Sequence, residues 1–126
     1  MESPLSNLIV KGSKKIEEVM YNILKDYIRL DEESREVIFL ESAKDLSVEK
    51  RILLLLMGYK AMEILNLITD SSLSPREIAE KIGANYNTVR SQLSKLAREG
   101  LISKMGKGKY CVQLSKIIEL SELFKK

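Results

Sequence analysis

The amino-acid sequence predicts a mainly α-helical protein with one small β-hairpin near its C-terminal end and a helical extension at its N-terminal end. Two observations predict this class: apolar residues recur at helical spacing along much of the chain, and strand-like alternation surrounds the tripeptide "GKG" at 106–108. With 126 residues, the chain can bury one modest core and is too short for two full-sized domains. We expect an arm and helical extension over residues 1–45, and the main domain with a C-terminal helix over residues 46–126.

The first helix is expected to start after Gly12 and Ser13 and to carry one apolar stripe. Apolar residues follow one another there at steps of four, three, four and three, which places them on one side of a helix. They are Ile16, Met20, Ile23, Tyr27 and Leu30. Since the main domain can build a core without it, we expect this stripe to form a homodimer. The terminal helix would add Ile117, Leu120 and Phe124. Packing onto the chain's own domain is the alternative.

Residues 32–44 are expected to form a second helix, because the acidic start "DEES" suits the positive end of a helix dipole. The run "REVIFLE" would also serve as a short strand, so that alternative stays open. Ser47 then caps a long apolar helix that reaches about Ile68, and Gly58 is a candidate break within it.

Two short helices separated by barely a turn follow from Ser74. Ser74 and Glu77 have the spacing of a capping box, and Pro75 stands at the first helical position, where a helix tolerates proline best. Gly83 supplies the positive φ that ends this helix in an abrupt turn. Asn85 can cap the next helix, which we expect to run to Glu99.

The second of these helices has one apolar side and one polar side. At about 100° per residue, Val89, Leu93, Leu96 and Ala97 share the buried stripe, with Tyr86 at its edge. The opposite side and its flanks carry amide, hydroxyl, guanidinium and ammonium groups and no carboxylate before Glu99. These groups belong to Asn87, Thr88, Arg90, Ser91, Ser94, Lys95 and Arg98. Such groups read base edges and hold phosphates.

The runs "LISKM" and "KYCVQL" then read as two strands around "GKG", with Lys104, Lys107 and Lys109 at or beside the tip. The basic charge is concentrated in this half of the chain. Residues 71–126 carry 11 Lys and Arg against 5 Asp and Glu, whereas residues 1–70 carry 10 against 13. Such an asymmetry is typical of nucleic-acid-binding proteins.

The stretch from about Tyr59 to Leu114 resembles the winged helix-turn-helix domain of prokaryotic, particularly archaeal, transcription regulators. The resemblance rests on "LSPREIAEKIGANYNTVRSQLSKLAREGLI" followed by "GKGKY", and covers less than half of the chain. It implies a winged helix-turn-helix fold that binds double-stranded DNA, with the helix from Asn85 in the major groove and the hairpin, or wing, on the backbone or minor groove. The implied contacts are Asn87, Thr88, Arg90, Ser91 and Lys95 on the helix and Lys107 and Lys109 on the wing. Asn85, Ser94, Arg98 and Lys104 complete the predicted DNA-binding surface.

The function expected from this resemblance is transcription regulation by occupancy of a promoter-like site. A protein-interaction module of a replication, transcription or RNA-processing assembly is the main alternative, and an RNA-binding subunit is a weaker one. A basic surface that continues from Arg90 and Lys95 to the wing would favour DNA. Exposed apolar residues there would favour protein.

An enzyme is the least expected class. The chain has no histidine and one cysteine, Cys111, which reads as a packed strand thiol, so we expect no metal and no cofactor. Carboxylate pairs such as Glu32 and Glu33 stand in segments that look solvated. The uninterrupted apolar run 52–57 is far below the roughly 18 residues of a membrane span, and "MESPLSNLIV" does not read as a secretion signal. We expect a cytoplasmic protein.

Overall fold

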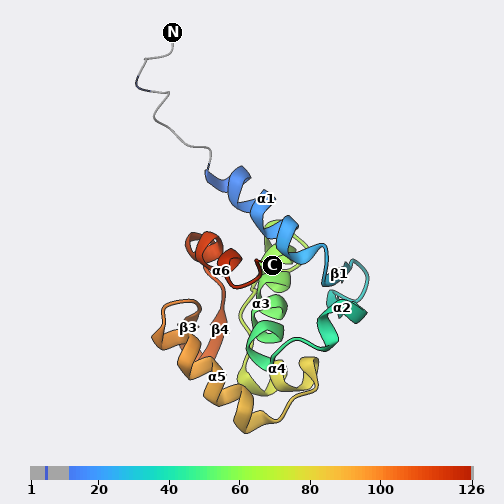
Figure 1. Ribbon diagram of the computed structural model, residues 1–126, viewed down its shortest axis with the longest axis vertical. Coiled ribbons are helices and arrows are strands. Elements are labelled where there is room, and N and C mark those ends of the chain that lie inside the picture. The colour runs from blue at the N-terminus through green and yellow to red at the C-terminus, as the bar shows by residue number, and fades with distance from the viewer. Residues whose placement is uncertain (1–4, 6–11, 126) are drawn as a thin grey trace.

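The computed structural model describes residue 5 and residues 12–125 of the chain, and Figure 1 shows their arrangement. In chain order the elements are α1 (Gly12–Leu24), β1 (Ile28–Asp31), β2 (Glu36–Phe39), α2 (Glu41–Lys44), α3 (Val48–Ile64), α4 (Pro75–Ile82), α5 (Tyr86–Arg98), β3 (Ser103–Met105), the 3-10 turn η2 (Gly106–Gly108), β4 (Lys109–Cys111), the 3-10 turn η3 (Leu114–Lys116) and α6 (Ile117–Glu122). The mainly helical class with a small hairpin wing is confirmed. The arm expected at the start of the chain lies almost entirely outside the described residues.

Helix α3 forms the centre of the core. Ser47 caps its first turn, as predicted, by accepting a hydrogen bond from the backbone N–H of Lys50 at 3.2 Å. Residues 52–59 are buried without interruption, because α1, α4, α5 and β1 all contact this helix. The helix ends at Ile64 rather than at the predicted Ile68. Burial on several sides explains why the middle of the helix, residues 52–59, is apolar all round instead of amphipathic.

The suggested break at Gly58 does not occur, since α3 continues through this residue. Gly58 instead permits the β1–β2 hairpin to approach α3 closely. A Cβ atom at this position would lie 2.7 Å from Val37 Cγ2 and 2.9 Å from Ile28 Cδ1. Because Val37 and Ile28 belong to β2 and β1, the absence of a side chain lets this hairpin lie directly on α3.

The prediction of one helix over residues 32–44 is wrong for most of its length. The strand alternative is right for the central part, and only the end, α2 (Glu41–Lys44), is helical. Strands β1 and β2 pair antiparallel, with Leu30 opposite Val37. The acidic run "DEES" forms the turn between them, where the Asp31 carboxylate accepts the backbone N–H of Glu33 at 3.0 Å. Hydrogen bonds from the Ser34 side chain and the Glu33 and Ser34 backbone lower the pKa of Asp31. An acidic residue caps a turn here by the same chemistry that would have favoured a helix start.

The first helix is shorter than predicted. It ends at Leu24, Tyr27 lies in the connection that follows, and Leu30 belongs to β1. The chain itself buries Met20 and Ile23, because α1 packs against α3 and α6. The predicted dimer stripe is therefore not a free surface, and its members pack mainly onto the chain's own domain.

The terminal helix α6 closes the core beside α1. Ile117 and Leu120 are fully buried, and the ring of Phe124 lies 5.9 Å from that of Tyr27, centroid to centroid. The two ends of the described chain therefore meet on the same side of α3 (Figure 1). The predicted partnership between the first and last helices exists, but it forms within one chain.

Candidate nucleic-acid interface

Helix α4 begins and ends as its sequence predicts. Ser74 Oγ accepts the backbone N–H of Glu77 at 3.2 Å, and a Glu77 carboxylate oxygen accepts the backbone N–H of Ser74 at 3.1 Å, which completes the capping box. Gly83 ends the helix with a φ of +65°. A guanidinium nitrogen of Arg51 on α3 donates to the carbonyl of Ile82 at 2.8 Å. The turn before the next helix is thus fixed by the backbone conformation of Gly83 and by the hydrogen bond from Arg51.

Helix α5 starts at the predicted cap. Asn85 Oδ1 accepts the backbone N–H groups of Asn87 at 2.8 Å and Thr88 at 3.3 Å. Val89, Leu93 and Leu96 are completely buried against the core, as the periodicity predicts. The cap occupies the oxygen of Asn85, so only its amide NH₂ group remains to donate to a ligand.

The polar side of α5 faces solvent. Asn87, Thr88, Arg90, Ser91, Ser94, Lys95 and Arg98 are all exposed. Lys95 differs from the other cations, because its Nζ lies 3.5 Å from a carboxylate oxygen of Glu49 on α3 and 3.9 Å from one of Glu99. Within the described part of the chain, Arg90 and Arg98 form no ion pair, and we therefore rank them above Lys95 as phosphate ligands.

The wing is anchored to the start of α4. Tyr110 of β4 exchanges two backbone hydrogen bonds with Leu73, of 2.8 and 2.9 Å, so the segment before Ser74 pairs with the wing. In the wing, β3 and β4 pair with Met105 opposite Lys109. Its tip contains Lys107 and Gly108 with φ values of +66° and +70°. The tight reversal thus displays Lys107 to solvent, whereas Lys109 is half-buried.

A hollow of about 330 Å³ joins α5 to the wing. Arg90 and Ser94 line it from α5, and Lys104 lines it from β3. Cations from α5 and from the wing therefore line one space, whereas Lys95 lies outside it. Residues 83–110 contain six Lys and Arg and a single acidic residue, Glu99, so the surrounding field is strongly positive.

The sequence did not single out Arg76 and Tyr86 as site residues. The Tyr86 ring lines the hollow, and the guanidinium carbons of Arg76 and Arg90 lie 4.6 Å and 5.7 Å from its centroid. The aromatic ring thus holds cations from α4 and α5 beside each other. The sequence feature that could have identified Arg76 is its position in the first turn of α4, one residue after Pro75.

A comparison with protein families agrees with this geometry. Residues 59–103 match the family model described as winged helix-turn-helix DNA-binding. The structure has the fold that this description names, with α4 and α5 as the helix-turn-helix and β3 and β4 as the wing. The match ends where β3 begins, so the wing of this winged helix-turn-helix is defined by the structure. No curated protein and no solved structure matches the chain significantly.

The remaining chemistry of the described residues is sparse. Residue 5 and residues 12–125 contain no group of three or more His, Cys, Asp or Glu side chains that could hold a metal ion. No helix in this part of the chain is long and apolar enough to cross a membrane. Cys111 is buried, and its burial raises the pKa of the thiol. A raised pKa disfavours the thiolate, which is the reactive form.

Proposed function

We propose that this chain is a sequence-specific double-stranded DNA-binding protein that regulates transcription by occupying a promoter-like site. Helix α5 enters the major groove, where Asn87 and Ser91 meet base edges. The wing lies along the flanking backbone or minor groove, with Lys104 and Lys107 toward phosphates. Arg90 and Arg98 hold the backbone on either side of α5. The match of residues 59–103 to a DNA-binding family supports this proposal.

The single observation that carries the proposal is that cations from two different elements line one hollow. Arg90 of α5 and Lys104 of β3 both line this space. A DNA backbone is a row of negative charges, so neighbouring cations from the helix and the wing fit it better than isolated lysines would.

A protein partner would be favoured by apolar residues on the same surface. Among the described residues of α5 and the wing, Met105 is the one large hydrophobic residue that is exposed, at 44%. One methionine among six cations is a small apolar contribution, since protein interfaces are built around buried apolar centres. The nucleic-acid function is therefore preferred.

The proposal is tested by titrating the purified chain against labelled duplex fragments from its own genome at several salt concentrations. Specific fragments should bind more tightly than scrambled ones, and log affinity should fall linearly with log salt. Replacing Arg90 and Lys104 together with alanine should weaken binding to every duplex. If two phosphate contacts are lost, the salt slope should fall by about 1.8.

Lys15→Ala is the matched control, because Lys15 is an exposed cation on α1 at the opposite end of the molecule from α5 (Figure 1). It should leave both affinity and slope nearly unchanged. Absence of binding to any duplex at low salt would contradict the proposal and favour the protein-interaction module. Equal affinity for all duplexes would retain DNA binding but remove sequence specificity.

A further inference from the structure

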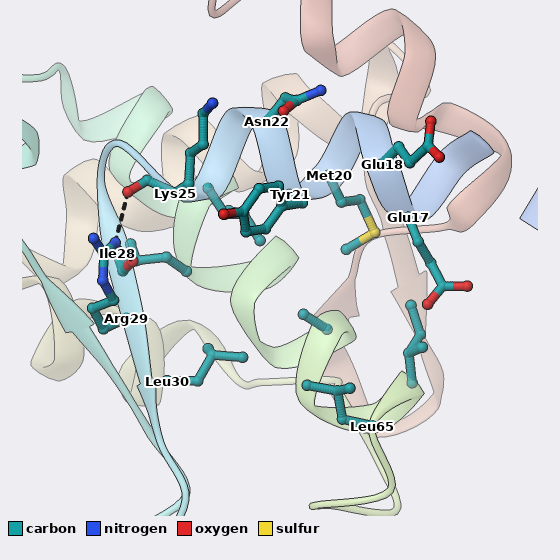
Figure 2. A pocket seen from close by; sticks show the side chains of 13 residues that line it. Glu17, Glu18, Met20, Tyr21, Asn22, Lys25, Ile28, Arg29, Leu30 and Leu65 are labelled. Atoms are coloured by element: carbon teal, nitrogen blue, oxygen red, sulfur yellow. Dashed lines mark hydrogen bonds between the residues drawn. The ribbon is translucent and has the colours of Figure 1, made fainter. Parts of the chain in front are cut away.

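A large apolar groove lies at the end of the molecule opposite to α5. It has a volume of about 960 Å³ and is bounded by α1, β1 and the C-terminal end of α3 (Figure 2). Met20, Leu24 and Ile28, which are buried, form its floor. We call this the α1 groove. It is separate from the hollow between α5 and the wing, with which it shares no residue.

The rim of the α1 groove exposes large apolar side chains. Tyr21 on α1 is 66% exposed, and Leu65, just after α3, is 59% exposed. Single exposed apolar residues are ordinary, but here two of them flank a groove with an apolar floor. A surface of this composition is typical of an interface with another macromolecule.

The charges around the groove have a definite polarity along α1. Glu17 and Glu18 lie toward the start of the helix, and Lys25 and Arg29 lie beyond Tyr21 (Figure 2). The groove therefore has an acidic end and a basic end, with Tyr21 between them. A surface with this pattern is complementary to itself after a rotation of 180°, as a twofold symmetric interface requires.

From this self-complementarity we infer that the α1 groove is covered by the α1 groove of a second copy of this chain. The two α1 helices run antiparallel, with the Tyr21 side chains near the twofold axis. The acidic end of each helix then faces the basic end of its partner. The exposed apolar rim supplies the affinity, and the charges fix the orientation, since exposed ion pairs contribute little energy of their own.

The position of the groove is compatible with simultaneous DNA binding. In Figure 1, α1 lies at one end of the molecule, whereas α4 and α5 lie at the other. Covering the α1 groove with a second copy thus leaves the cationic surface of both copies open. This dimer differs from the predicted one in its contacts, because it is built on the exposed residues Tyr21 and Leu65 rather than on the buried residues Met20 and Ile23.

The inference is tested by sedimentation of the full chain without DNA, so that its outcome is independent of the proposed function. The wild-type chain should sediment as a dimer at tens of micromolar. Glu18→Lys and Lys25→Glu, made separately, should each weaken self-association about tenfold, because each replaces two symmetric attractions by two repulsions. An equimolar mixture of the two variants should recover the dimer, since both ends of the mixed interface become complementary.

Leu65→Glu should also weaken the dimer, because it places a carboxylate against the apolar part of the groove. Ile118→Glu is its matched control: Ile118 is a similarly exposed residue on α6 that does not line the groove, and its replacement should leave the dimer intact. Circular dichroism melting shows that each variant is folded. A wild-type monomer at 100 μM would overturn the inference. Variants that associate as strongly as wild type, or a mixture that fails to recover, would also overturn it.

Discussion

Gly58 shows how one residue decides the placement of a whole hairpin. In an exposed helix, alanine is more stable than glycine by roughly 1 kcal/mol, so a surface Gly58 would be a simple defect. Here the space for a Cβ atom is already occupied by Val37 and Ile28. Val37 cannot easily withdraw, since rotation about χ1 of a β-branched side chain is restricted. The packing cost should exceed the gain in helix propensity.

We therefore predict that Gly58→Ala lowers the free energy of unfolding by about 1 to 3 kcal/mol, the usual cost of overpacking a core. Urea denaturation followed by circular dichroism measures it. In the Val37→Ala background, which removes the nearest methyl groups, the same change should cost much less and show a favourable coupling in a double-mutant cycle. Equal costs in both backgrounds would show that contact with Val37 is not the cause.

At the scale of elements, α5 and the wing are expected to differ in what they recognise. Asn87→Ala with Ser91→Ala should remove about 1 to 3 kcal/mol of preference for each lost base contact and leave non-specific affinity nearly unchanged. Lys107→Ala should weaken all duplexes alike and reduce the salt slope by about 0.9. Binding of both variants to a specific and a scrambled duplex across a salt series separates the two effects. A change of sequence preference in the wing variant would reverse these roles.

The elements that were predicted correctly are those whose ends are set by residues close together in the sequence. Ser74 with Glu77, Gly83 and Asn85 each act within a few residues, and all three signals proved correct. The hairpin β1–β2 was predicted as a helix because an acidic run suits both a helix start and a turn, and only pairing with a partner strand decides between them. For the same reason Gly58 was taken for a break.

In the candidate site, too, the features of a single helix could be predicted from the sequence, whereas contacts between helices could not. The exposed face of α5 followed from helical periodicity, which fixes orientation once the buried stripe is known. The pairing of Lys95 with Glu49 and the contact of Arg76 with Tyr86 join residues from different helices. Such contacts depend on how the helices pack. The α1 groove is also a product of packing, since its lining comes from three separate elements.

At the scale of the whole molecule, the two proposed interaction surfaces lie at opposite ends, with α3 between them (Figure 1). The β1–β2 hairpin, whose first strand lines the α1 groove, is tied to α4 by the 3.1 Å ion pair between Glu36 and Lys81. The Lys81 ammonium also lies 5.7 Å from the centroid of the Tyr59 ring on α3. Glu36, Tyr59 and Lys81 thus join the β1–β2 hairpin, α3 and α4 through polar contacts.

Tyr59 and Lys81 of this network, together with Cys111 of β4, make the folded chain less stable at alkaline pH. Burial raises the pKa of Tyr59 and of Cys111 above their ordinary values of 10.0 and 9.0. Burial of Lys81 opposes its charge, but hydrogen bonds with Tyr59 and Glu36 outweigh this effect and raise its pKa above 10.5. In each case the folded chain holds the proton more tightly than the unfolded chain. Their stabilisation is therefore complete below about pH 9 and is lost as the pH rises through the folded pKa values.

We predict that the free energy of unfolding, measured by urea denaturation, is lower at pH 10.5 than at pH 8. The double variant Tyr59→Phe/Cys111→Ala lacks two of the three titrating groups, so its stability should decline less over the same interval, whatever its stability at pH 8. Lys15→Ala, which removes an exposed cation outside this network, should keep the wild-type decline. A wild-type stability that stayed constant or rose from pH 8 to 10.5 would contradict the prediction, because the folded chain would then not hold these protons more tightly.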